Sequence, residues 1–202
     1  MSAPRGGYAL VAPTASGGPM PDVVDLIISD HRELQRMFEV LRTDRSKRAA
    51  MAPVMSTLLF AHSRAEESEV YPRARDAGVE EDVEHSQKEH LVADQLAERL
   101  TGLDPESDEF GEVLDELVHA VTHHLEEEEE TVLPHMRERM DADSLQQLGE
   151  RFLAARAEHL GDQPDDMTRA ELEQQARNLD LSRSTQRSKA ELKDALEDEA
   201  EL

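Results

Sequence analysis

Two stretches of the chain each place a histidine four residues before a glutamate. His62 precedes Glu66, and His124 precedes Glu128. A valine and a proline follow both pairs at the same distance: Val70 and Pro72, Val132 and Pro134. Because residues i and i+4 of a helix lie on one face, each stretch can point an imidazole and a carboxylate at the same place. This internal repeat predicts a site with two equivalent halves, for which a dinuclear metal centre is the main candidate.

Composition limits the chemistry that such a site can use. The chain has 202 residues, no cysteine and a formal net charge of −24. The missing thiols exclude disulfides, zinc fingers, iron–sulfur clusters and cysteine nucleophiles, so any metal must be held by His, Asp and Glu. The acidic surface makes nucleic-acid phosphates and anionic membranes poor partners. With no long apolar run and no secretory signal, we expect a cytoplasmic protein.

Apolar residues spaced three and four apart predict the helices that position these side chains. The spacing indicates four long amphipathic helices: one that begins near Asp22 and has its last apolar position at Leu41, and three over about residues 46–75, 80–101 and 108–139. Short links between such helices favour an all-α, up-down-up-down four-helix bundle. An additional C-terminal helix is expected over 141–159. Aromatic residues make up only 3% of the chain, which suits a core of Leu, Val, Ala and Met.

Glycine, proline and charge divide the chain into four parts. Residues 1–21 are rich in Gly and Pro and are expected to be a disordered lead. Residues 22–160 are expected to form the bundle and 161–166 a linker. Residues 167–202 are expected to form a small separate unit of two short helices that ends in a charged tail from residue 197.

Six polar side chains replace apolar residues on the inward faces of the four helices. They are His31, His62, Glu66, His90, His124 and Glu128. An unpaired buried polar group costs ~1–3 kcal/mol, against a typical domain stability of ~5–15 kcal/mol. Bound cations would remove this cost. Mixed imidazole and carboxylate ligands favour iron, with manganese or zinc as alternatives, over calcium and magnesium.

Several neighbouring residues have simpler interpretations. A single histidine such as His31 or His90 is more often a hydrogen-bonded core residue, so the metal hypothesis rests on four of them together. We interpret the other glutamates of the two stretches as solvated: Glu67, Glu69, Glu126, Glu127, Glu129 and Glu130. Four histidines are assigned to the surface, with His123 as a possible outer support of the site: His119, His123, His135 and His159. For Tyr71 we expect packing or a hydrogen bond, with a role as redox neighbour as the alternative.

The ordered set of motifs resembles a known family. Asp30-His31, His62-x-x-x-Glu66 with Tyr71-Pro72, Glu89-His90 and His124-x-x-x-Glu128 with Pro134 are similar to the hemerythrin-like, or HHE cation-binding, domain. The resemblance implies a bundle around an oxo- or hydroxo-bridged pair of iron ions. Glu66 and Glu128 would bridge the irons, and His31, His62, His90 and His124 would be terminal ligands.

One position departs from the oxygen-carrying members of that family. Their fifth histidine lies one turn before the ligand of the third helix, where this chain has Ser86, and His85 is at the wrong spacing to replace it. The resemblance therefore points to the bacterial members associated with oxygen, nitric oxide or peroxide responses and with iron sensing, and away from simple oxygen storage.

The C-terminal part carries a second resemblance. Residues 167–172 and 187–196 resemble the small helical module at the N-terminus of transcription termination factor Rho, which is similar to SAP-like modules. This implies a possible nucleic-acid partner, which the acidic balance disfavours, or a protein partner. Three functions stay open: binding or sensing of dioxygen, nitric oxide or peroxide; a di-iron enzyme that removes peroxide or nitric oxide; and a metal-stapled interaction protein.

Overall fold

The computed structural model describes residues 21–162, 166–181 and 186–200. These residues form helices and no strand: α1 (Val23–Thr43), η1 (Arg45–Lys47), α2 (Arg48–Ala65), η2 (Glu66–Val70), α3 (Tyr71–Asp76), α4 (Glu80–Thr101), α5 (Asp108–Glu130), α6 (Val132–Arg139), α7 (Ala142–Glu158), α8 (Arg169–Asn178) and α9 (Lys189–Ala200). The all-α class is therefore confirmed for this part of the chain. The predicted lead, apart from Pro21, lies outside it. None of the described helices is long and apolar enough to cross a membrane.

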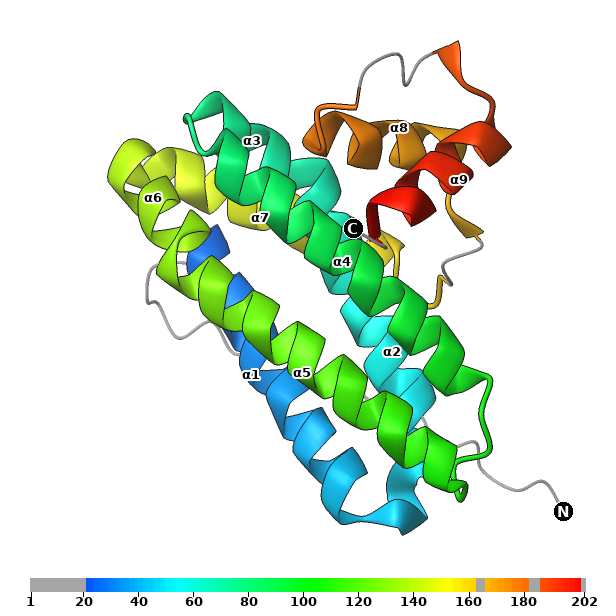
Figure 1. Ribbon diagram of the computed structural model, residues 1–202. Coiled ribbons are helices and arrows are strands. Elements are labelled where there is room, and N and C mark those ends of the chain that lie inside the picture. The colour runs from blue at the N-terminus through cyan, green and yellow to red at the C-terminus, as the bar shows by residue number, and fades with distance from the viewer. Residues whose placement is uncertain (1–20, 163–165, 182–185, 201–202) are drawn as a thin grey trace, which may run out of the picture.

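Four long helices make the bundle. In Figure 1, α1, α2, α4 and α5 lie side by side and run alternately in opposite directions, as the short links between them require. α1 packs on α2 and α5, and α4 packs on α2 and α5, so the four helices enclose one interior. The helix α7 lies across α1 and α2 outside the bundle. This arrangement is the predicted up-down-up-down bundle with an additional helix.

Helix ends follow local side-chain chemistry. Asp22, Ser107 and Asp141 cap α1, α5 and α7, each accepting a hydrogen bond from a backbone N–H of the first turn. Gly78 has φ +84°, a left-handed conformation that suits glycine, and it closes the turn after α3. The predicted starts of α1, α5 and α7 are therefore confirmed to within a residue or two.

Two predicted helices are each divided, which corrects the sequence-based boundaries. The helix expected over 46–75 consists of α2, the π-helical turn η2 and α3, and the helix expected over 108–139 breaks at Thr131 into α5 and α6. Pro72 and Pro134 follow these points, and proline lacks the N–H that a continuous helix would use. The π-helical turn therefore begins at Glu66 and the second break comes three residues after Glu128, in corresponding parts of the repeat.

Two apolar clusters fill the interior, with the polar candidate residues between them. The first apolar cluster lies toward the links between α1 and α2 and between α4 and α5; it includes Leu34, Phe38, Leu41, Met55, Phe110 and Leu114. The second lies toward α3, α6 and α7; it includes Val23, Ile27, Val70, Leu133, Leu148 and Phe152. The histidines and glutamates thus form a polar layer across the middle of the bundle.

The C-terminal helices α8 and α9 pack against each other and against α4, on the right of Figure 1. Leu91 of α4 joins their apolar cluster, which also contains Met167, Leu172, Ala176, Leu192 and Leu196. α9 continues to Ala200, so the residues expected as a charged tail from 197 are helical as far as the structure describes them. The division of the chain at 161–166 stays a prediction, but the helix pair is in contact with the bundle.

Candidate metal centre

All six predicted side chains are buried at the same level of the bundle. His31 comes from α1, His62 from α2, His90 from α4, and His124 with Glu128 from α5, while Glu66 begins the π-helical turn. Each has at most 4% of its surface exposed. The inward positions inferred from the helical spacing are therefore occupied as expected.

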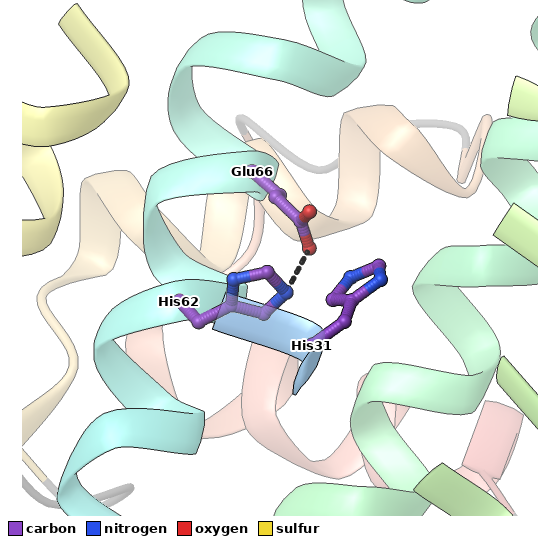
Figure 2. A group of neighbouring side chains, drawn as sticks. All are labelled: His31, His62 and Glu66. Carbon is purple, nitrogen blue, oxygen red and sulfur yellow. Dashed lines mark ion pairs between the residues drawn. The ribbon is translucent and has the colours of Figure 1, made fainter. Parts of the chain in front are cut away.

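The ligand atoms fall into two groups that share one carboxylate. His31, His62 and Glu66 form the first group, and Glu66, His90 and His124 form the second; within each group the donor atoms lie within 4.8 Å of one another. Figure 2 shows the two imidazoles of the first group beside the Glu66 carboxylate. Oε2 of Glu66 lies 3.2 Å from Nε2 of His62 and 3.4 Å from Nε2 of His90. Glu66 therefore stands between two possible cation positions.

Glu128 lies beside these groups on the α1 side. Its Oε2 is 3.3 Å from Nε2 of His31. On the other side of the centre, Nε2 of His90 and Nε2 of His124 are 3.0 Å apart. All four imidazoles thus present a ring nitrogen to the same volume, and the two carboxylates reach it from different helices.

A bound cation would satisfy the donor atoms of these side chains better than hydrogen bonds between them do. Nε2 of His31, both ring nitrogens of His62 and all four carboxylate oxygens of Glu66 and Glu128 are buried without a hydrogen-bond partner among the described residues. Buried polar atoms normally have such partners, and each unpaired one costs free energy. Nitrogen and carboxylate donors in this combination suit a transition metal. The residues present therefore fit the metal site inferred from the sequence.

Burial and neighbouring charges set the protonation states of the site. Burial, together with the nearby Glu128, raises the pKa of Glu66 well above its usual range. Burial would also raise the pKa of Glu128, but His31 and His124 hold that pKa at about 2. Burial lowers the pKa of His62 to about 4, and burial with the neighbouring His124 lowers the pKa of His90. For His62 and His90 these shifts favour the neutral imidazole, which is the form that binds metal. At His31 burial lowers the pKa, but Glu128 and Glu129 outweigh it and the pKa is raised.

A carboxylate faces the second ring nitrogen of each of the four histidines. The Nδ1 atoms lie 2.9 Å from Glu129 for His31, 3.4 Å from Asp30 for His62, 3.2 Å from Glu67 for His90 and 3.0 Å from Glu89 for His124. An acceptor hydrogen-bonded at Nδ1 keeps the proton there and leaves Nε2 free to bind metal. The chain therefore holds His31, His90 and His124 in the orientation and tautomer of a ligand, while Asp30 faces His62 at ion-pair distance.

Two of these carboxylates were assigned to solvent in the sequence interpretation, which is wrong. Glu67 is only 3% exposed, because the π-helical turn brings it inside next to Glu66. Glu129 is partly exposed, but it bonds His31 and Arg32. The position of a glutamate within an acidic run does not indicate such contacts. Glu67 and Glu129 do, however, directly follow the candidate ligands Glu66 and Glu128, and this adjacency was a signal that the sequence offered. Glu126 and Glu130 are exposed as predicted.

Tyr71 reaches the centre from the end of the π-helical turn. Its hydroxyl lies 3.1 Å from Nε2 of His90, and its ring stacks on that imidazole at a centroid distance of 5.3 Å. Ser86, at the position of the fifth histidine in oxygen carriers, is buried and bonds the same hydroxyl. A phenol and a serine thus lie where the resemblance would place an additional imidazole.

The remaining histidines lie outside these two buried groups, although His85 forms a third, more exposed group of possible ligand atoms with Glu89 and Glu127. His85 is 58% exposed and pairs with Glu127 at 2.9 Å, so it does not replace the fifth histidine. His123 is half exposed, and its Nδ1 lies 2.9 Å from Glu89, the carboxylate that also holds His124. The expectation that His123 supports the site from outside is consistent with this contact.

A four-helix bundle that buries four histidines and two glutamates in its middle layer has the architecture of a metal-binding helical protein. The chain belongs to the hemerythrin family: the model of the Hemerythrin HHE cation binding domain matches residues 22–136. The resemblance inferred from the motifs is confirmed by this match, and the matched range contains all six candidate ligands.

One curated relative is a protein named "DNA nickase" from Nostoc sp. (strain PCC 7120 / SAG 25.82 / UTEX 2576). It is 27% identical over 138 residues, which cover 67% of this chain and 39% of the relative. The chain thus matches well under half of that relative's length. No solved structure matches the chain.

Proposed function

We propose that this chain binds two iron ions at the buried centre and uses them to bind or sense dioxygen, nitric oxide or peroxide. The observation that carries the proposal is the sharing of Glu66 between two histidine-containing groups. A carboxylate between two sets of imidazoles is suited to bridging two cations. The membership of an HHE cation-binding family supports the metal, and the nitrogen-rich donor set supports iron over calcium or magnesium.

The residues have separate roles in this proposal. His31 and His62 would hold one cation and His90 and His124 the other, with Glu66 and Glu128 balancing their charge. Iron bound in this way supplies a change of oxidation state and open coordination positions for a small ligand. The Nδ1 carboxylates would hold the four imidazoles in place in both oxidation states.

Tyr71 favours binding or sensing over turnover. Burial and the nearby Glu128 and Glu66 raise the pKa of its phenol well above the usual range. In the metal-free chain the phenol is therefore protonated near neutral pH and can donate a hydrogen bond to a ligand at the centre, which supports binding. A group with a pKa this far from neutral is a poor general base.

Iron stoichiometry tests the proposal directly. Anaerobic loading of the purified chain, followed by desalting, should leave two irons per chain, and the visible spectrum should respond to dioxygen, nitric oxide or peroxide. Glu66→Ala should lose the paired site, as should Glu128→Ala. Glu69→Ala is the matched control, because Glu69 pairs with Arg151 away from the centre. Fewer than one iron per chain in the wild type would overturn the proposal.

Two rival activities can be measured on the same samples. Continuous loss of excess peroxide or nitric oxide would identify an enzyme, whereas one reversible spectral change per centre supports binding. The name of the Nostoc relative suggests a DNA-cleavage assay on supercoiled plasmid. We expect no nicking above that of Glu66→Ala, because the net charge of −24 repels the phosphate backbone.

A further inference from the structure

Two amide side chains of α8 are buried against the bundle. Gln175 is 1% exposed and Asn178 is fully buried, although both belong to the short C-terminal helix pair. Burying an amide costs free energy unless its hydrogen bonds are satisfied. A helix that needed only apolar attachment would place Leu or Ala at these positions, as α8 does at Leu172 and Ala176.

Both amides bond to one residue of the π-helical turn. Nε2 of Gln175 lies 3.2 Å and 3.1 Å from the two carboxylate oxygens of Glu67. Nδ2 of Asn178 donates to the backbone oxygen of Glu67 at 3.1 Å and to Oε1 of Gln87 at 2.8 Å. Arg75 closes the contact by donating to the backbone oxygen of Asn178 at 2.7 Å. Docking of α8 therefore converges on Glu67.

Glu67 is also the residue that holds His90. Its Oε1 lies 3.2 Å from Nδ1 of His90 and accepts a hydrogen bond from Gln87 at 2.8 Å, and Arg64 bonds its other oxygen. The side chains Gln175, Glu67 and His90 thus form a continuous chain of contacts. It runs from the C-terminal helix pair to the second group of candidate ligands.

We infer that docking of the α8–α9 pair and metal binding at His90 are thermodynamically linked through Glu67, so that the helix pair reports whether the centre is occupied. The inference rests on the proposed function, because it requires a cation at the centre. It extends that function, because the attachment of the α8–α9 pair to the bundle would then depend on whether the centre holds a cation.

The sign of the linkage follows from the hydrogen bond between His90 and Glu67. The carboxylate of Glu67 holds the ring proton on Nδ1 of His90, which leaves Nε2 for a metal. A cation on Nε2 polarises the imidazole and makes its Nδ1–H a stronger donor to Glu67 than the neutral ring provides. Gln175 bonds the same carboxylate and completes this arrangement. Metal binding and docking should therefore favour each other.

The interface has the packing expected of a contact that can open. A cavity of about 180 Å³ lies between α4 and the helix pair, lined in part by Leu91, Met167 and Leu196. This pocket is partly open to solvent, so the helix pair does not close completely over α4. The apolar attachment is therefore incomplete, and the polar contacts with Glu67 contribute a larger share of the docking free energy than they would in a closely packed interface.

Hydrogen–deuterium exchange of the full chain tests the linkage. Amides of α8 and α9 should exchange at least about five-fold more slowly in the iron-loaded chain than in the chelated chain, the lower end of typical coupling between sites. Amides around Leu114, in the first apolar cluster, serve as the internal reference. Unchanged exchange in α8 and α9 of a chain that binds iron would overturn the linkage alone. Failure to bind iron would overturn the proposed function and the linkage with it.

Substitution of Gln175 tests the reverse direction, because linkage is reciprocal. Gln175→Glu places a carboxylate against Glu67, so it should release α8 and α9 and weaken iron binding by about ten-fold or more. Gln175→Leu, which cannot hydrogen-bond, should have a smaller effect of the same sign. Gln147→Leu on the exposed face of α7 is the matched control and should change neither quantity. A Gln175→Glu chain with released helices and wild-type iron affinity would contradict the inference.

Discussion

At each of the four buried histidines, one ring nitrogen faces the centre and the other faces a carboxylate. Three of these carboxylates are held in turn by arginines: Arg156 pairs with Asp30 at 2.7 Å, Arg32 with Glu129 at 2.6 Å, and Arg64 with Glu67. Such outer partners fix ring orientation and raise ligand basicity. The geometry of the candidate centre therefore depends on residues two contacts away from its donor atoms.

Removing one of these carboxylates should weaken metal binding without unfolding the chain. Glu129→Ala takes away the partner of His31 Nδ1, and we expect iron affinity to fall about 10- to 100-fold. Glu130→Ala removes the same charge from the next, exposed position and should have little effect. Chelator competition measures both affinities. Equal losses in the two variants would show that general charge, and not the contact with His31, controls binding.

Asp94 gives the chain a pH-dependent stability that is separate from the ligands. It shares Arg64 with Glu67, and burial raises its pKa to about 7 even though Arg64 opposes the shift. The folded state therefore binds a proton that the unfolded state releases from about pH 4 upward. The unfolding free energy should fall as pH rises from about 4 to about 7, by at most about 1.4 kcal/mol per unit.

Asp94→Asn should remove that slope while keeping an acceptor for Arg64. Urea unfolding of the metal-free chain between about pH 5 and about pH 8 would measure it, with Glu112→Gln, a change at an exposed position of α5, as the control. The wild type and Glu112→Gln should lose stability with rising pH, and Asp94→Asn should lose less. Parallel curves for all three proteins would show that Asp94 is ionised throughout this range.

At the scale of helices, local signals predicted most of the architecture. The caps at Asp22, Ser107 and Asp141 and the glycine at 78 are short-range features, so the sequence contains the information for these helix ends. The π-helical turn after Ala65 depends on how the helix packs, since the same residues would also suit an ordinary α-helix. Such turns often occur at functional sites. Here the turn brings both Glu66 and Glu67 into the interior.

The candidate ligands could be predicted from the sequence, whereas the carboxylates that contact them from outside could not. The difference is that the first signal lies within one helix and the second depends on contacts between helices. A candidate ligand such as His90 interrupts the apolar face of its own helix, and the sequence shows this interruption directly. Glu67 and Glu129 gain their roles from His90 and His31 on other helices, and the distances that join them exist only in the folded chain. The contact of Gln175 with Glu67 joins segments 108 residues apart and has no local sequence signal.

The crossing of α7 over α1 depends on a close approach at Gly149. A Cβ added there would lie 3.1 Å from the backbone nitrogen of Val23 and 3.2 Å from Cδ1 of Leu26. Gly149→Ala should therefore cost about 1–3 kcal/mol of unfolding free energy. Gly111→Ala is the matched change, since its Cβ would meet nothing nearer than 3.9 Å, and a helical alanine should be neutral or stabilise by up to ~1 kcal/mol. Equal effects in denaturant unfolding would argue against the close contact.

At the scale of the whole molecule, the polar layer separates two apolar clusters that would otherwise form one core. The first cluster contains residues of α1, α2, α4 and α5 only. The second cluster contains residues of the bundle helices together with residues of α3, α6 and α7. Between them, Glu66 and Glu128 place two carboxylates close together, and burial with this neighbour raises the pKa of Glu66. Cations in this layer would replace the repulsion between the two carboxylates with attraction to the metal. The two apolar clusters would then be stabilised together.

Removing the metal should therefore lower the stability of the entire bundle and weaken the middle first. A cation present at 100 times its dissociation constant adds about 2.7 kcal/mol per site to the unfolding free energy, and chelation would remove that contribution. Amide exchange should rise most near the layer, at residues 61–66 and 121–128, and less around Leu34 and Leu41 in the first apolar cluster.

The control for metal removal is a chain that cannot form the paired site. Chelator should change the unfolding midpoint of Glu66→Ala much less than that of the wild type, because the variant has less bound metal to lose. Urea unfolding and amide exchange, each with and without chelator, measure the two effects. If the metal content of the wild type falls to zero while its unfolding free energy and its exchange at 61–66 stay the same, the cations do not join the two halves of the core. The polar layer would then be stabilised by its own hydrogen bonds and ion pairs alone.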